Sequence, residues 1–169
     1  MNYLTLALRL IHIFAGVFWV GGALMMNFFI APTIEATAEA GQQFARHFIG
    51  KARVGTAMLV AGFSSVTAGA ILYWFDSDGF TSPWMKSGAG IGFTIGAVFA
   101  LIGLVFGIMI YRNTTALGKL GAQIQGKPTP EQLARLQAIQ KQQAMISPLN
   151  AYSLTLAVVF MAVARYLVF

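Results

Sequence analysis

The sequence lacks cysteine, and this absence excludes disulfides, thiolate metal sites and iron–sulfur clusters. Charged side chains are also scarce. They make up 9% of the 169 residues, whereas soluble domains carry about 25%. The acidic residues all fall in predicted loops or extramembrane helix, so no buried carboxylate pair suggests a proton relay. The chain has no serine–histidine–acid set, zinc motif or phosphate-binding loop, and hydrolase or kinase activity therefore has no support.

Hydrophobic residues dominate the composition. They account for 57% of the chain, and the mean hydropathy is +0.71. The first apolar run, Leu10 to Ala31, exceeds the roughly 7–15 residues of a signal-peptide core, so we expect a retained transmembrane helix. Residues 1–169 leave no room for a second sizeable domain and predict a single integral membrane domain. Basic residues are not mixed with aromatics as in a nucleic-acid-binding patch, so we expect no nucleic-acid partner.

Four segments contain the roughly 20 mostly apolar residues that a bilayer core requires. They cover about residues 3–31, 54–75, 84–111 and 148–169. The second helix is expected to begin before its membrane part, near residue 43, with a polar first segment. Pro32 follows the first segment, and Ser147 with Pro148 fits an N-cap and first-turn proline for the fourth. The sequence therefore predicts an all-α fold, a bundle of four transmembrane helices.

Residues 112–147 form a long link between the third and fourth helices. Thr129 with Gln132 three residues later fits a capping box, and Pro130 fits the first helical position. We therefore expect the third helix to continue out of the membrane, turn, and return into the fourth. Two helices lying on the membrane surface are the alternative, but the glutamines of this link leave no broad apolar face for lipid. The pattern favours a protruding hairpin.

The lysine and arginine residues are distributed unequally between the loops. Eight of the 11 fall on the side that holds the first and third loops, and Arg9, Lys86 and Arg165 fall on the other. The positive-inside rule then places the hairpin in the cytoplasm and both termini outside.

Glycines recur on single faces of two predicted helices. Gly55, Gly62 and Gly69 repeat every seven residues in the second, and a further glycine face occupies the third. Small residues let transmembrane helices approach closely, because burial against lipid gives no hydrophobic gain. These faces therefore indicate tight helix packing in preference to a conduction path.

His12 is an ionisable ring inside the first apolar segment. Its helix face continues with Gly16, Trp19, Ala23 and Met26, and Arg9 lies one turn before it. The small residues predict a groove beside the ring, suited to a large flat ligand or to a close neighbouring helix. Imidazole is a ligand for haem iron and for copper. The alternatives are a histidine hydrogen-bonded to another helix or one at the headgroup level.

Other candidate residues are expected at the depth of His12, in the outer layer of the bilayer. Tyr73 and Trp74 are predicted to lie in this layer. Cationic side chains there suit porphyrin propionates, and methionine sulfurs suit iron or Cu(I). The cations are Arg9, Lys86 and Arg165, and the methionines are Met85 and Met161. His47 is predicted at the opposite membrane boundary, so the two histidines are not expected to hold one haem together.

The stretch "HIFAGVFWVGG", with His12, Trp19, Gly21 and Gly22, resembles the first-helix motif of the copper-resistance D-type membrane proteins and associated uncharacterised four-helix bacterial membrane proteins. It is also similar to the haem-binding membrane protoporphyrinogen oxidase family, whose first helix has a histidine followed by a Trp-x-x-Gly-like pattern. That family has a functional lysine near the start of a later helix, and "SPWMKSGAG" places Lys86 comparably. That family has further histidines around its first loop and third helix, whereas the third helix here ends in "MIYRN", without one. The resemblance covers the first three helices and implies a bacterial inner-membrane protein.

Three functions stay open from the sequence. The first is a haem b-binding redox protein with His12 as axial ligand, acting as a membrane oxidoreductase with a quinone or porphyrin partner. The second is copper handling by His12 with Met85 or Met161. The third is a non-catalytic subunit of a larger membrane complex or homo-oligomer, with the glutamine-rich hairpin as a contact surface.

Overall fold

The structure is a computed structural model that describes residues 3–124 and 126–168, and the elements assigned in these two ranges are all helical. Four helices are long and apolar enough to cross a membrane: Tyr3–Ala36, Val54–Asp76, Gly88–Gln123 and Pro130–Tyr166. Many large apolar side chains are exposed along them, such as Phe14 and Val17 at 71% and 68%. The prediction of an all-helical fold is confirmed, and the four apolar helices with exposed apolar side chains are compatible with the predicted transmembrane helices.

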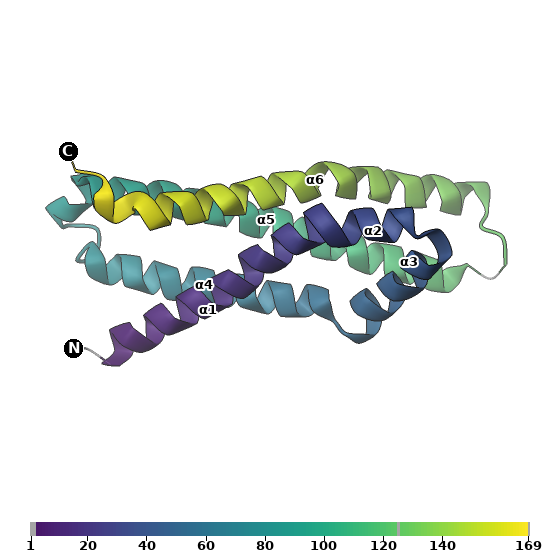
Figure 1. Ribbon diagram of the computed structural model, residues 1–169, viewed down its shortest axis with the longest axis horizontal. Helices are drawn as coiled ribbons and strands as arrows, with labels where there is room; N and C mark the ends of the chain where they lie inside the picture. The colour runs from purple at the N-terminus through teal and green to yellow at the C-terminus, as the bar shows by residue number, and fades with distance from the viewer. Residues whose placement is uncertain (1–2, 125, 169) are drawn as a thin grey trace.

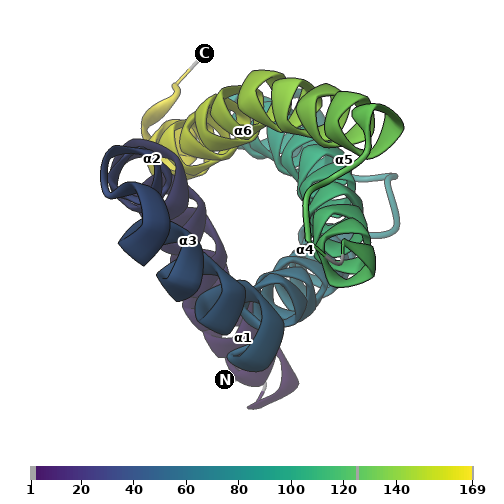
Figure 2. The same ribbon diagram turned by 90° about the vertical axis from the view of Figure 1, so that its right-hand side faces the viewer.

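The four long helices form two antiparallel pairs. Helix α1 (Tyr3–Met25) pairs with α4 (Val54–Asp76), and α5 (Gly88–Gln123) pairs with α6 (Pro130–Val163) (Figures 1 and 2). Both termini lie at the end of the molecule where α4 connects to α5 (Figure 1). One buried cluster joins the pairs at the centre, and it consists of Trp19, Ala23, Ala61, Leu104 and Leu154.

The first helical segment does not end before Pro32. A π-helical turn at Met26–Ile30 follows α1, and α2 (Ala31–Ala36) continues through the proline. Proline lacks an N–H and clashes with the carbonyl four residues earlier. The wider π turn, closed by the Ala31 N–H to the Met26 carbonyl, accommodates this misfit.

The polar segment before the second apolar helix forms elements of its own. Helix α3 (Ala38–Ala45) and a π-helical turn at Arg46–Lys51 come first, and Arg53 then adopts a left-handed conformation with φ of 51°. The chain changes direction there, because this conformation cannot continue a right-handed helix. A separate apolar helix starts at Val54, where we predicted the membrane part to begin, and the single helix from residue 43 was wrong.

The third span begins later than its composition predicted. Pro83–Lys86 forms a short 3₁₀ turn, and the Ser87 side chain then accepts the Gly90 N–H at the start of α5. A serine acceptor at this position satisfies an N–H that has no partner within the helix. Lys86 and Met85 therefore precede the third helix.

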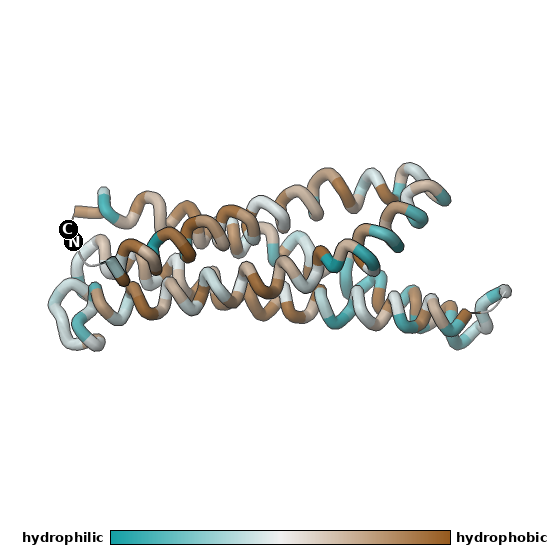
Figure 3. Tube along the Cα trace, turned by 90° about the horizontal axis from the view of Figure 1, so that it is seen from below, coloured by the Kyte–Doolittle hydropathy of each residue, from teal (hydrophilic) through white to brown (hydrophobic). Residues whose placement is uncertain are grey.

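The link between α5 and α6 is a helical hairpin. Helix α5 continues unbroken to Gln123, and α6 starts with the predicted capping box of Thr129 and Gln132. Pro148 lies inside α6, so the predicted N-cap at Ser147 was wrong. Prolines are tolerated in transmembrane helices whose neighbours supply other contacts. Hydrophilic residues gather on α3 and along the hairpin (Figure 3).

Candidate functional site

His12 on α1 is hydrogen-bonded to Ser65 on α4. Its Nδ1 lies 2.8 Å from the Ser65 carbonyl oxygen, and the Ser65 hydroxyl donates to the His12 carbonyl oxygen at 3.0 Å. A carbonyl oxygen can only accept, so this geometry favours the proton on Nδ1. The neutral ring then has its lone pair on Nε2, and no hydrogen bond to Nε2 occurs within the described ranges.

Glycines on both helices allow this close approach. A Cβ on Gly69 would lie 2.8 Å from Cε1 of His12, and one on Gly16 would lie 3.2 Å from the Ser65 hydroxyl oxygen. The glycine face and the His12 face therefore meet directly. The groove predicted beside the ring is taken up, on this side, by α4.

Trp19 repeats the arrangement one heptad further along. A Cβ on Gly62 would lie 2.9 Å from its indole ring, and the side chain is only 4% exposed. His12 and Trp19 are seven residues apart, and so are Gly69 and Gly62. Because α1 and α4 run antiparallel, His12 lies against Gly69 and Trp19 against Gly62. Trp19 accordingly lies in the buried centre of the bundle, where it contributes to packing.

His12 lies deeper than the outer layer in which we expected it. Its partner, Ser65, is the central residue of α4. Tyr73 lies about 12 Å further along that helix. It contacts Trp84 with ring centroids 5.4 Å apart, and its hydroxyl is 2.6 Å from that of Thr94. These aromatic residues are thus separate from the histidine, which lies beside the midpoint of α4, a helix long enough to cross a membrane. Ionisable residues at that depth are functional candidates by default.

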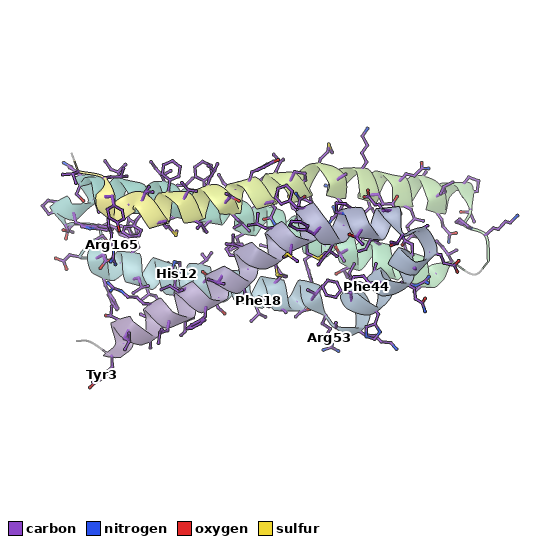
Figure 4. The ribbon with its side chains drawn as sticks, viewed as in Figure 1. Tyr3, His12, Phe18, Phe44, Arg53 and Arg165 are labelled. Atoms are coloured by element: carbon purple, nitrogen blue, oxygen red, sulfur yellow. The ribbon has the colours of Figure 1, made fainter. Side chains whose placement is uncertain are left out.

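The predicted cations are exposed. Arg9 lies one turn before His12 on α1, Lys86 lies in the 3₁₀ turn, and Arg165 lies just beyond α6. Their side chains have no hydrogen-bond or ion-pair partner among the residues that the structure describes. Arg165 and His12 lie in the half of the bundle that holds the termini (Figure 4). The fold therefore leaves these cations available without bringing them into contact with the ring.

The predicted methionine ligands belong to a different interface. Met161 packs against α5, where a Cβ on Gly96 would lie 2.7 Å from its Cγ. Met85 is half-buried in the 3₁₀ turn. The His12 ring lies instead at the interface of α1 with α4. The structure therefore does not bring either methionine sulfur to His12. The described part of the chain contains no cluster of three histidine or acidic side chains suited to a metal ion.

His47 lies in the π-helical turn before α4, and His12 is hydrogen-bonded at the middle of that helix. This arrangement agrees with the expectation that the two rings do not share a ligand.

Sequence reasoning missed Ser65, although a signal was present. Ser65 lies three residues after Gly62 and four before Gly69, so it shares their helix face. A hydroxyl on a face of small residues is a sign of an interhelical hydrogen bond. Asn150 was also missed. It is 6% exposed, and its side-chain oxygen has no hydrogen-bond partner in the described residues.

Comparison with known proteins adds no further assignment. No family model, curated protein or solved structure matches this chain.

Proposed function

We propose that this chain is an integral membrane protein that binds haem b through Nε2 of His12 and takes part in electron transfer. The observation that carries the proposal is the hydrogen bond from Nδ1 to the Ser65 carbonyl oxygen. Metal-binding histidines almost always donate their second ring N–H in this way, which fixes the tautomer and orients the ring.

The residues present are compatible with a haem. His12 would supply one nitrogen ligand. Arg9, Lys86 and Arg165 have no partner among the described residues and would suit two propionate carboxylates. When bound, haem supplies one-electron chemistry. The chain's own part is to orient the imidazole through Ser65, so that Nε2 points away from this hydrogen bond. The lipid-exposed helices suit an apolar partner such as a quinone or a porphyrin.

We infer the orientation from the basic residues. The end of the bundle that holds α3 and the hairpin carries most of them, which supports a cytoplasmic hairpin and periplasmic termini in a bacterial inner membrane.

An absorption spectrum of the detergent-purified protein, oxidised and then reduced, tests the haem proposal. We expect a Soret band that is lost in His12→Ala and retained in the matched control His47→Ala. A protein without a Soret band, purified from cells supplied with haem precursor, contradicts the proposal. An unchanged band in His12→Ala also contradicts it.

A second candidate function is that of a non-catalytic subunit in a larger membrane complex. It is favoured by the hairpin, on which Leu133 and Met145 are 46% and 57% exposed among exposed glutamines. A stable, ligand-free single species after mild solubilisation, with no co-purifying chain, contradicts it. Copper content measured on the same sample separates copper handling from both.

A further inference from the structure

A surface groove of about 570 Å³ lies between α1 and α4, and neither His12 nor Ser65 lines it. Its floor is made by small side chains, including Ala15 and Ala57. Phe18 and Val60 flank it and are 52% and 61% exposed. Arg53 lies at one end and is the one charged residue that lines it. The groove is thus open, shallow and apolar, with a cation at one end.

The length of the groove along α4 matches the thickness of one leaflet of a bilayer. On α4 it extends from Arg53, immediately before the helix, to Ser64, beside the central residue. That interval is about 16 Å long at 1.5 Å per residue. Half of a typical hydrocarbon core is about 15 Å. The groove is therefore long enough to hold an acyl chain that spans one leaflet from a headgroup at Arg53.

Arg53 is free to bind an anion at that end of the groove. Its side chain is exposed and has no hydrogen-bond or ion-pair partner in the described ranges. Arg46 and Lys51 precede it in the π-helical turn and add positive charge at the same end. Figure 4 shows Phe18 on α1 and Arg53 at the end of α4 nearest α3. A guanidinium presents several N–H donors that match phosphate oxygens.

We propose that this groove binds one anionic phospholipid from the leaflet on the Arg53 side. One acyl chain lies along Ala57 and Val60, and the phosphate is held by the Arg53 guanidinium. The occupant follows from the charge and the shape together, because a flexible apolar chain attached to an anion complements an apolar groove that ends in a cation. The proposal is independent of haem binding.

Native mass spectrometry of the detergent-purified protein tests it. The protein is incubated with equal amounts of phosphatidylglycerol and phosphatidylcholine that carry the same acyl chains. We expect about fivefold more bound phosphatidylglycerol, which corresponds to one basic residue near the surface. Arg53→Gln should abolish the preference, whereas Arg112→Gln, an exposed arginine of α5 outside the groove, should retain it.

A second pair of variants tests the groove itself. Ala57→Leu places a larger side chain in the groove and should lower retention of both lipids severalfold. Ala70→Leu makes the same change at an exposed position of α4 outside the groove and should have no effect. Equal losses of preference in Arg53→Gln and Arg112→Gln, or normal lipid retention in Ala57→Leu, would overturn the proposal. Size-exclusion profiles identical to wild type establish that the variants are folded.

Discussion

The two helix pairs of this bundle use one packing device with different side chains. In the α5–α6 pair, Gly103 and Gly96 of α5 receive Leu154 and Met161. In the α1–α4 pair, glycines of α4 receive Trp19 and His12. These glycines of α5 thus receive aliphatic side chains, and a stacked Phe99–Phe160 pair also joins α5 to α6. The glycines of α4 receive aromatic rings, and hydrogen bonds between His12 and Ser65 also join α1 to α4.

The comparison shows that a glycine stripe alone does not identify a functional site. Both stripes allow close approach, as expected for helices that gain nothing from burial against lipid. What distinguishes the pairs is the side chain that each glycine accepts. The flexible Met161 side chain can move when space is reduced, whereas a buried indole or a hydrogen-bonded imidazole cannot move without losing contacts.

The largest expected effect is at the α1–α4 interface. Gly62→Leu places a side chain against the Trp19 ring, which is buried and has no free space to enter. We expect a loss of about 3 kcal/mol in stability, the upper end for overpacking. Denaturant unfolding in detergent measures it. Gly21→Leu is the control, because a Cβ there meets nothing within 4 Å. Equal losses would show that Trp19 is not held against Gly62.

An intermediate effect tests the hydrogen bonds. Ser65→Ala removes the hydroxyl that donates to the His12 carbonyl oxygen but keeps the backbone carbonyl that accepts from Nδ1. We expect a loss of about 1 kcal/mol, typical of an interhelical hydrogen bond in a membrane. Ser153→Ala is the matched change in α6, at a buried serine without such a bond in the described residues, and should be nearly neutral. The same unfolding measurement compares them, and a neutral Ser65→Ala would contradict the assignment.

A loss of similar size, but confined to one helix turn, is expected in the hairpin that connects α5 to α6. Thr129→Ala removes the side-chain oxygen that accepts the Gln132 N–H. Loss of such a cap costs about 1 kcal/mol and should loosen only the first turn of α6. Faster amide hydrogen exchange at residues 131–133, with unchanged exchange around Leu154, is the expected result. Faster exchange in both places would show that the hairpin is coupled to the bundle core.

The smallest effect is a pH dependence at the same cap. The pKa of Glu131 lies below its ordinary value of 4.5, because its own backbone N–H and the Thr129 side chain hydrogen-bond to the carboxylate. A group with a lowered folded-state pKa stabilises the fold above the ordinary pKa, and this contribution is lost as the pH falls through the lower value. Hydrogen exchange of the first α6 turn should therefore accelerate below pH 4.5, relative to the rest of the helix. Glu131→Gln should remove this dependence, and its persistence would assign it to another group.

Several elements were predictable because their signals are local. The apolar run from Val54 and the capping box at Thr129 depend on residues within one or two turns, and both are present as predicted. Pro148 was misread because a proline fits a first turn as well as a tolerated position inside a packed helix. The choice between them depends on what lies before it, and α6 is already helical from its cap at Thr129.

The sequence by itself determined that the chain forms four apolar helices with glycine faces, and that one of them carries a histidine. Composition and heptad spacing are enough for that, since lipid selects long apolar segments and close packing selects small residues. Only the tertiary structure decided the partner and depth of His12 and the groove that ends at Arg53. Both depend on the register between α1 and α4, and two equal heptad repeats permit several registers. The contacts of His12 with Ser65 and of Trp19 with Gly62 select one.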